Sequence, residues 1–245
     1  MTATGVDTEQ VMAFRIAAHH LHERMREGSV PAAAGACGLQ DTPPGSALLA
    51  LNARVRGVRP ETLVDAVEDR SLFHTWAMRG SPFFFPTADL AVFTAGVLPE
   101  AEKARLHLIL GVEQALEQLD MGLDEAVERI RAALRDVLAG RQLAINELGA
   151  ELARAIAGDL SAATRRRWEA EGPYAKGQPW GEAVVHFGLR ILCLQRSVCF
   201  AHRDGKQLPF VRTDEWLGDP PARADPALAR AEITRRYLRC YGPST

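Results

Sequence analysis

Residues 36–55 read ACGLQDTPPGSALLALNARV and mark the point where one structural element ends and the next begins. The Pro-Pro pair interrupts a regular element, because proline lacks a backbone N–H and restricts the residue before it. Gly45 or Ser46 then provides the N-cap of a helix that we expect to run through Arg56. A short polar segment followed by a helix is therefore predicted here.

Residues 69–90 read DRSLFHTWAMRGSPFFFPTADL and have the pattern of a β-hairpin. Two short aromatic-rich runs, 73–78 and 82–86, flank the turn sequence Arg79-Gly80-Ser81. A helix over 60–68, with proline at its first position, precedes this hairpin. Helices followed by a hairpin are the element order of a winged helix.

The same order of elements recurs later in the chain. Apolar residues at spacings of three and four predict amphipathic helices, and an Asp-Gly-Lys turn between β-prone runs predicts a second hairpin. The predicted helices span 11–26, 46–56, 60–68, 87–97, 99–119, 123–139, 142–157, 181–195 and 227–240, and the second hairpin pairs 197–202 with 207–213. We therefore expect a mainly α chain with small β-hairpins, built from tandem winged helix-turn-helix units.

This element order divides the chain into five segments. The two units are not a close sequence repeat, so the duplication is visible only in the order of elements. We expect a frayed N-terminus over 1–9, a first winged-helix unit over 10–98, a connecting helix over 99–121, a second winged-helix unit over 122–217, and a linker with the start of an incomplete third unit over 218–245.

Composition limits the function classes. The 245 residues carry a formal net charge of −2, which argues against indiscriminate nucleic-acid binding but allows a local basic face. Four scattered cysteines without a CxxC spacing indicate reduced thiols in a cytoplasmic protein. No apolar run approaches the roughly 20 residues that span a bilayer, so no membrane partner is expected. His19, His20 and His22 do not share one helix face, and we predict no metal site and no other cofactor.

Both quoted stretches resemble a winged-helix family that contains the AlkZ and YcaQ DNA glycosylases. The likeness is most specific at 38–54 and 69–90, where residues 75–80 match the family segment Thr-Trp-x-Met-Arg-Gly. The resemblance implies a winged-helix fold, double-stranded DNA as partner, and a monofunctional hydrolase that excises alkylated bases (N7-alkylpurines or crosslinked bases) during DNA repair in a bacterial cytoplasm. In family members a segment like Tyr241-Gly242-Pro243 leads into a third winged helix, so the chain looks truncated there; a naturally short relative is the alternative.

The family's glycosylases carry a Gln-x-Gln or Gln-x-Asp motif, and the matching triplet is Gln40-Asp41-Thr42. Thr42 stands where a second Gln or Asp is expected, and Asp41 is one residue out of register, so on extended backbone it faces away from Gln40. In a catalytic interpretation Gln40 orients water, Thr42 relays a hydrogen bond, and Asp41 stabilises charge if the loop turns it inwards. In the alternative, Gln40 and Thr42 satisfy backbone groups before the proline turn. Phe83 replaces a histidine common in the family and is expected in the core.

Basic and polar residues near the predicted turns and recognition helix are candidate DNA contacts. A wing-tip arginine suits phosphate or minor-groove contact, and a helix-turn-helix places the start of its recognition helix in the major groove. The alternative is a solvated charged face, because acidic residues are interspersed. The candidates are Arg79, Ser81, Arg165, Arg166, Arg167, Lys176, Arg190, Arg203 and Lys206.

Three functions remain open from the sequence. The first is a DNA glycosylase that hydrolyses the N-glycosidic bond of alkylated bases. The second is a non-catalytic winged-helix protein that binds DNA or regulates transcription. The third is a protein-interaction module, since winged helices also pair with proteins.

Overall fold

The computed structural model describes residues 5–202 and 207–243, which form two compact units. The first unit contains the residues up to His74, Ser81–Val97, and the residues from Ala224 onward. The second contains Thr75–Gly80 and Leu98–Arg223. The chain therefore passes between the units within the predicted hairpin, and its C-terminal helix belongs with its N-terminal half.

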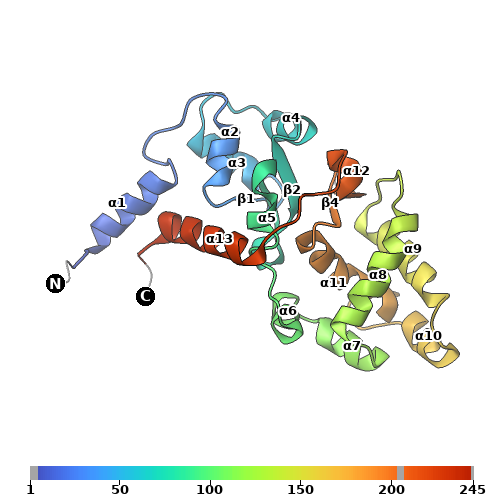
Figure 1. The fold of residues 1–245 in the computed structure, drawn as a ribbon. Helices are drawn as coiled ribbons and strands as arrows, with labels where there is room; N and C mark the ends of the chain where they lie inside the picture. Colours follow the sequence, from blue (N-terminus) through green and yellow to red (C-terminus); the bar gives the residue numbers. More distant parts are fainter. Residues whose placement is uncertain (1–4, 203–206, 244–245) are drawn as a thin grey trace. The chain divides into compact units, whose positions relative to one another are not determined.

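The first unit combines short helices with a small sheet (Figure 1). The strands are β1 (Leu39–Gln40), β2 (Leu72–Trp76, whose last two residues belong to the second unit) and β3 (Pro82–Pro86), in the order β1-β3-β2. The helices are α1 (Thr8–Ala18), α2 (Val30–Gly35), α3 (Ser46–Arg54), α4 (Thr62–Glu68), η2 (Thr87–Asp89), α5 (Leu90–Phe93) and α13 (Pro226–Tyr241).

Aromatic side chains hold this first unit together. The Phe85 ring lies between Phe73 and Phe93, with ring centroids 5.9 and 4.7 Å away. All three rings are buried. Helix α13 packs on α5 and α1, and Arg236 of α13 forms a bidentate ion pair with Asp89, at 2.6 and 2.9 Å. The C-terminal helix is thus fixed to this unit by apolar packing and by a charge pair.

The second unit is helical with a two-stranded sheet. Its core is formed mainly by α8, α9 and α11, and Trp168 of α10 donates from Nε1 to the Ala153 carbonyl at 2.9 Å. Gly181 allows the close approach of α11, because a Cβ there would lie 2.1 Å from the Trp168 ring. The elements are η1 (Met78–Gly80), α6 (Glu102–Leu108), α7 (Val112–Leu119), α8 (Leu123–Val137), α9 (Ile145–Ala157), α10 (Ala162–Glu169), α11 (Trp180–Leu194), β4 (Val198–Phe200), β5 (Phe210–Arg212) and α12 (Thr213–Leu217).

The expected fold class, mainly α with small β-sheets, is confirmed. Both strands of the first hairpin are present and neighbouring, and the helix after the proline pair begins at Ser46 with Gly45 as N-cap. β4 and β5 pair in antiparallel fashion within the segments expected for the second hairpin. The expected turn at 204–206 lies outside the described residues.

Several predicted helix bounds are wrong. The helix expected over 11–26 ends at Ala18, and none of its residues is buried, so its apolar pattern does not face a core. The helix expected over 87–97 ends at Phe93, and the one expected from residue 60 begins at Thr62.

The predicted connecting helix over 99–121 is two helices, α6 and α7. Gly111 lies between them with φ of +95°, a conformation that breaks an α-helix and suits glycine. The apolar spacing of this segment continues across the break, which is why periodicity alone predicted one helix. Helices α2, α10 and α12 and strand β1 were not predicted.

Candidate DNA-binding and catalytic residues

Gln40 is the last residue of β1 and is held by the sheet. Its backbone lies opposite Phe83 of β3, and the N–H of the next residue, Asp41, donates to the Pro82 carbonyl at 2.9 Å. The Gln40 side chain is half-buried, and its Nε2 donates to the Ser81 hydroxyl at 3.4 Å. Sequence reasoning placed Gln40 and Ser81 in different roles, and the β1–β3 pairing brings them together.

Asp41 turns inwards, where it organises the backbone that follows it. The side chain is 6% exposed, and its Oδ1 accepts from the N–H groups of Gly45 and Ala47 at 2.7 and 3.4 Å. These groups belong to the start of α3, where backbone N–H groups lack helical partners. The carboxylate therefore shapes the proline turn and stabilises the first turn of α3, a role that the sequence analysis did not predict.

Thr42 and Phe83 complete the neighbourhood of the motif. Thr42 is exposed, and its hydroxyl forms no hydrogen bond with another residue of the described ranges. Phe83 is 4% exposed, so the prediction that it belongs to the core is confirmed. The amide of Gln40 and the hydroxyl of Ser81 thus lie together at this point of the first unit, while Thr42 is exposed.

In the second unit, Arg190 of α11 lies beside the hairpin turn that carries Arg79. Arg79 is exposed and has φ of +57°, which is uncommon for a residue with a side chain. A Cβ added at Gly80 would lie 3.8 Å from Cδ of Arg190. The structure therefore places Arg190 next to Gly80, the residue that follows Arg79 in the hairpin turn.

Aromatic rings position the Arg190 guanidinium. It lies over Trp76 at 5.0 Å and over Phe187 at 5.7 Å, within the range of cation–π attraction. Burial lowers the pKa of Arg190 from its usual value, although arginine remains charged at neutral pH. Trp76 packs against the core and is thus also a platform for a cation.

The three consecutive arginines at 165–167 lie on α10 and have different surroundings. Arg165 donates from Nε and Nη2 to the carbonyls of Ala157 and Gly158, at 2.6 and 2.8 Å, at the C-terminal end of α9. Arg167 donates to the Gln118 carbonyl at 3.3 Å. Arg166 is exposed, and within the described residues its side chain forms no hydrogen bond or ion pair. The segment was expected between two helices, and it is a helix.

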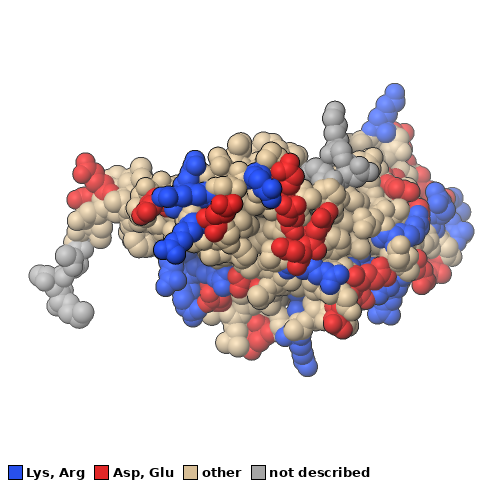
Figure 2. All heavy atoms as spheres, turned by 90° about the horizontal axis from the view of Figure 1, so that it is seen from above, with Lys and Arg blue, Asp and Glu red and all other residues tan. Residues whose placement is uncertain are grey.

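The remaining candidates are at the surface or outside the described residues. Lys176 is exposed in the loop between α10 and α11. Arg203 and Lys206 lie outside the described ranges. Figure 2 shows Lys and Arg interspersed with Asp and Glu on the face in view, in keeping with the formal net charge of −2.

The described residues form neither a metal-ligand cluster nor a helix able to span a membrane. Within residues 5–202 and 207–243, no group of three or more His, Cys, Asp and Glu residues is arranged to hold a metal ion. No described helix has the length and apolar character needed to cross a bilayer.

Comparisons with known proteins identify one family and one related structure. Residues 33–245 match the family model described as "DNA glycosylase AlkZ-like". The structure is similar to Streptomyces sahachiroi DNA glycosylase AlkZ, with a TM-score of 0.69 and 22% sequence identity. The match covers 99% of this chain and 59% of that chain. No curated protein matches the chain.

Proposed function

Because this chain belongs to the AlkZ-like DNA glycosylase family, we propose that it binds double-stranded DNA and excises alkylated bases by hydrolysing the N-glycosidic bond. The proposed role is monofunctional base removal in DNA repair, in the cytoplasm of a bacterium, without a cofactor. The observation that carries the proposal is the family match over residues 33–245, which includes Gln40 and both compact units. The chain spans 59% of the length of the AlkZ structure it matches, so activity, substrate and DNA partner are all part of the proposal.

The surroundings of Gln40 support a role in orienting water. The amide contacts the Ser81 hydroxyl, and it is carried by a strand rather than by a mobile loop, so its position is restricted. An N7-alkylated purine is cationic and leaves readily. The protein then needs to orient a nucleophilic water and to stabilise developing positive charge, and it does not need a strong general base. Gln40 supplies the orientation in this proposal.

Asp41 acts indirectly in this mechanism. Its carboxylate is occupied by the N–H groups of Gly45 and Ala47, so it holds the turn beyond Gln40 rather than contacting a base. Its negative charge also contributes to the potential around the motif. Thr42 is the departure from the family motif, and its solvent-exposed hydroxyl predicts slow excision.

The proposed DNA contacts are the basic residues that the fold leaves accessible. Arg79 at the hairpin turn, Arg166 on α10 and Lys176 after it are exposed. Arg190, held by Trp76 and Phe187, lies next to the turn of Arg79. We include a tandem winged-helix arrangement in the proposal, with α11 as the recognition helix of the second unit.

The test is base excision from alkylated duplex DNA by the purified protein, with duplex binding measured in parallel. We expect release of N7-alkylguanine, abolished by Gln40→Ala with duplex binding nearly unchanged. Gln142→Ala is the matched control, because Gln142 is also a glutamine but is exposed and distant in sequence from the motif. Binding without excision would replace the proposal with a non-catalytic DNA-binding protein. Absence of binding at low salt by folded protein would favour an interaction module.

A further inference from the structure

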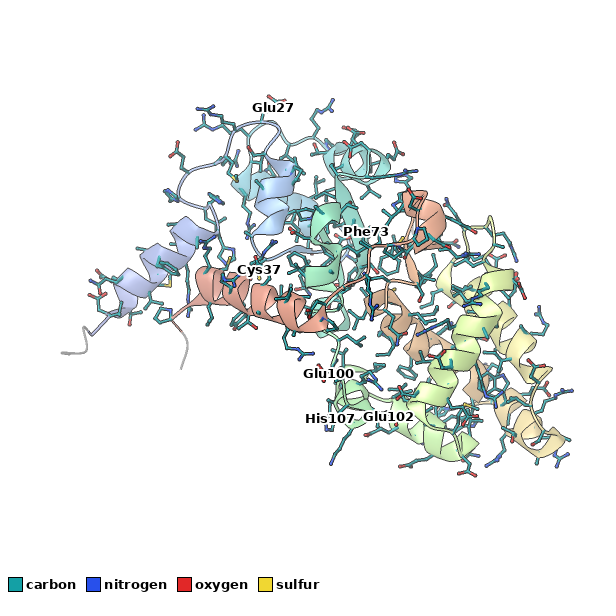
Figure 3. The ribbon with its side chains drawn as sticks, viewed as in Figure 1. Glu27, Cys37, Phe73, Glu100, Glu102 and His107 are labelled. Carbon is teal, nitrogen blue, oxygen red and sulfur yellow. The ribbon has the colours of Figure 1, made fainter. Side chains whose placement is uncertain are left out.

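Two cysteines of the first unit, distant in sequence, lie in contact. Cys37 follows α2, and Cys240 is the second-last residue of α13. The two thiols are hydrogen-bonded to each other, and Sγ of Cys240 lies 3.6 Å from the Ala36 carbonyl. Figure 3 shows Cys37 beside α13. Both side chains are reduced and buried.

Contacts other than the thiols fix this pairing. Arg236, one turn before Cys240, donates to the Gly35 carbonyl at 2.8 Å and pairs with Asp89 and Glu232. The end of α13 is therefore held over the end of α2 by an ion-pair network. The proximity of the two sulfur atoms follows from this packing.

The surroundings of Cys240 favour a thiolate. The hydrogen bond from Cys37, together with the positive charges of Arg239, Arg54 and Arg236, lowers the pKa of the Cys240 thiol to about 7 despite its burial. A low-pKa thiolate with nearby cations is the reactive form of cysteine.

Cys240 also has a route to small reagents. It lines a cleft of about 410 Å³ between α2 and α13. Cys240 belongs to the last turn of α13, beyond Arg236, and helix ends open locally at a lower free energy than the core.

The second unit contains a second pair with the opposite properties. Cys193 lies in α11 and Cys199 in β4, and both are 0% exposed. Burial raises the pKa of Cys193 to about 12, and it raises the pKa of Cys199 well above its usual value. These thiols lie within the core, so they serve as an internal reference for the first pair.

We propose that Cys37 and Cys240 are a redox-active dithiol site that accepts low-molecular-weight disulfides and closes to an intramolecular disulfide. The Cys240 thiolate attacks one sulfur of the small disulfide, whose S–S bond breaks to release one small thiol. Cys37, losing its proton, then attacks the Cys240 sulfur of the mixed disulfide and releases the second small thiol. The protein is oxidised by two electrons and the small disulfide is reduced to two thiols. This property goes beyond base excision and does not depend on it.

The test is exposure of the folded full chain to glutathione disulfide at pH 7.5, followed by non-reducing peptide mapping by mass spectrometry. We expect a loss of about 2 Da, a crosslinked peptide joining Cys37 to Cys240, and unmodified thiols at Cys193 and Cys199. The melting temperature should rise by roughly 5 °C, because the crosslink closes a long loop in the unfolded chain.

Variants distinguish the two sulfur atoms. Cys37→Ser should stop the reaction at a glutathione adduct on Cys240, whereas Cys240→Ser should leave Cys37 unmodified over the same time. Cys199→Ser is the matched control and should retain the crosslink. Peptide mapping of the chain without substitutions tests the proposal even if a serine variant does not fold. The proposal is overturned if both thiols remain free in the folded chain, or if all four cysteines react at similar rates.

Discussion

At the residue scale, the position of Thr42 determines what the motif of this chain can do. The Gln40 amide donates to the Ser81 hydroxyl, while the Thr42 side chain is exposed. A longer carboxamide at position 42 has both a donor and an acceptor and reaches further than a hydroxyl. The substitution Thr42→Gln therefore tests whether the site around Gln40 lacks one polar group.

We expect Thr42→Gln to raise the rate of N7-alkylguanine release by about fivefold, since one well-placed hydrogen bond contributes about 1 kcal/mol. Single-turnover excision assays measure this rate. Thr62→Gln, outside the motif, is the matched control. An unchanged rate in Thr42→Gln, with Gln40→Ala still inactive, would mean that Gln40 works without a partner at this position.

At the element scale, α10 carries arginines that contact neighbouring backbone carbonyls and one exposed arginine, Arg166. Arg165 donates to two carbonyls at the end of α9, where cations and donors are favourable. Its neighbour Arg166 has no such contact within the described residues and is exposed. Two adjacent residues of the same chemistry therefore form a controlled comparison.

We expect Arg165→Ala to lower the free energy of unfolding by about 1–2 kcal/mol, because it leaves helix-terminal carbonyls without their charged donor. Arg166→Ala should change stability by less than about 0.5 kcal/mol. It should instead weaken duplex binding and reduce the slope of log K against log salt by about 0.9, the value for one phosphate contact. Denaturant unfolding and salt-dependent binding measure the two effects. Equal binding loss in both variants would contradict this division of roles.

Local signals in the sequence were enough for the elements whose contacts are also local. The hairpin of β2 and β3 was predicted from aromatic runs around a Gly-containing turn, and the start of α3 from a proline pair and its cap. The contacts of the candidate site were not predictable in this way. The Gln40–Ser81 contact depends on pairing between β1 and β3. Arg165 donates to carbonyls at the end of α9, a contact that depends on how α10 packs against α9. Gly111 lies within an apolar pattern that continues on both sides, so the break between α6 and α7 was invisible to periodicity.

At the scale of the whole molecule, the partly buried His186 of the second unit links stability to pH. His186 of α11 is neutral, with its Nε2 3.1 Å from the Ile145 carbonyl and its Nδ1 3.0 Å from the Gln178 amide. Burial lowers the pKa of His186, and Arg190 adds to this, although Glu182 and the Ile145 carbonyl act in the opposite direction. The folded chain therefore resists protonation that the unfolded chain accepts.

The lower pKa of His186 in the folded chain sets the direction in which stability changes with pH. Above the unfolded histidine pKa of about 6.5 neither state binds the proton, and as the pH falls below it only the unfolded state gains one, so stability falls. We expect the melting temperature to drop between pH 7.5 and 5.5, and less so in His186→Gln. His19→Gln is the comparison, because burial also lowers the pKa of His19, which belongs to the first unit. The same pH dependence in His186→Gln as in the unmodified chain would exclude His186 as its source.

The register of strand β1 fixes the positions of Gln40 and Asp41, so an insertion or deletion before them would displace both side chains. Its register places Leu39 opposite Phe84 and Gln40 opposite Phe83, and successive side chains alternate between the two faces of a strand. Deleting one codon between α2 and β1 would bring the Asp41 carboxylate into the place of the Gln40 amide. It would also remove the acceptor for the N–H groups of Gly45 and Ala47 at the start of α3. In a library selected for folded protein, in-frame single-codon deletions at 36–38 should therefore be depleted, whereas codon 42 should accept many amino acids. Point mutations can thus change residue 42 during evolution, while the register of β1 against β3 keeps Gln40 in place.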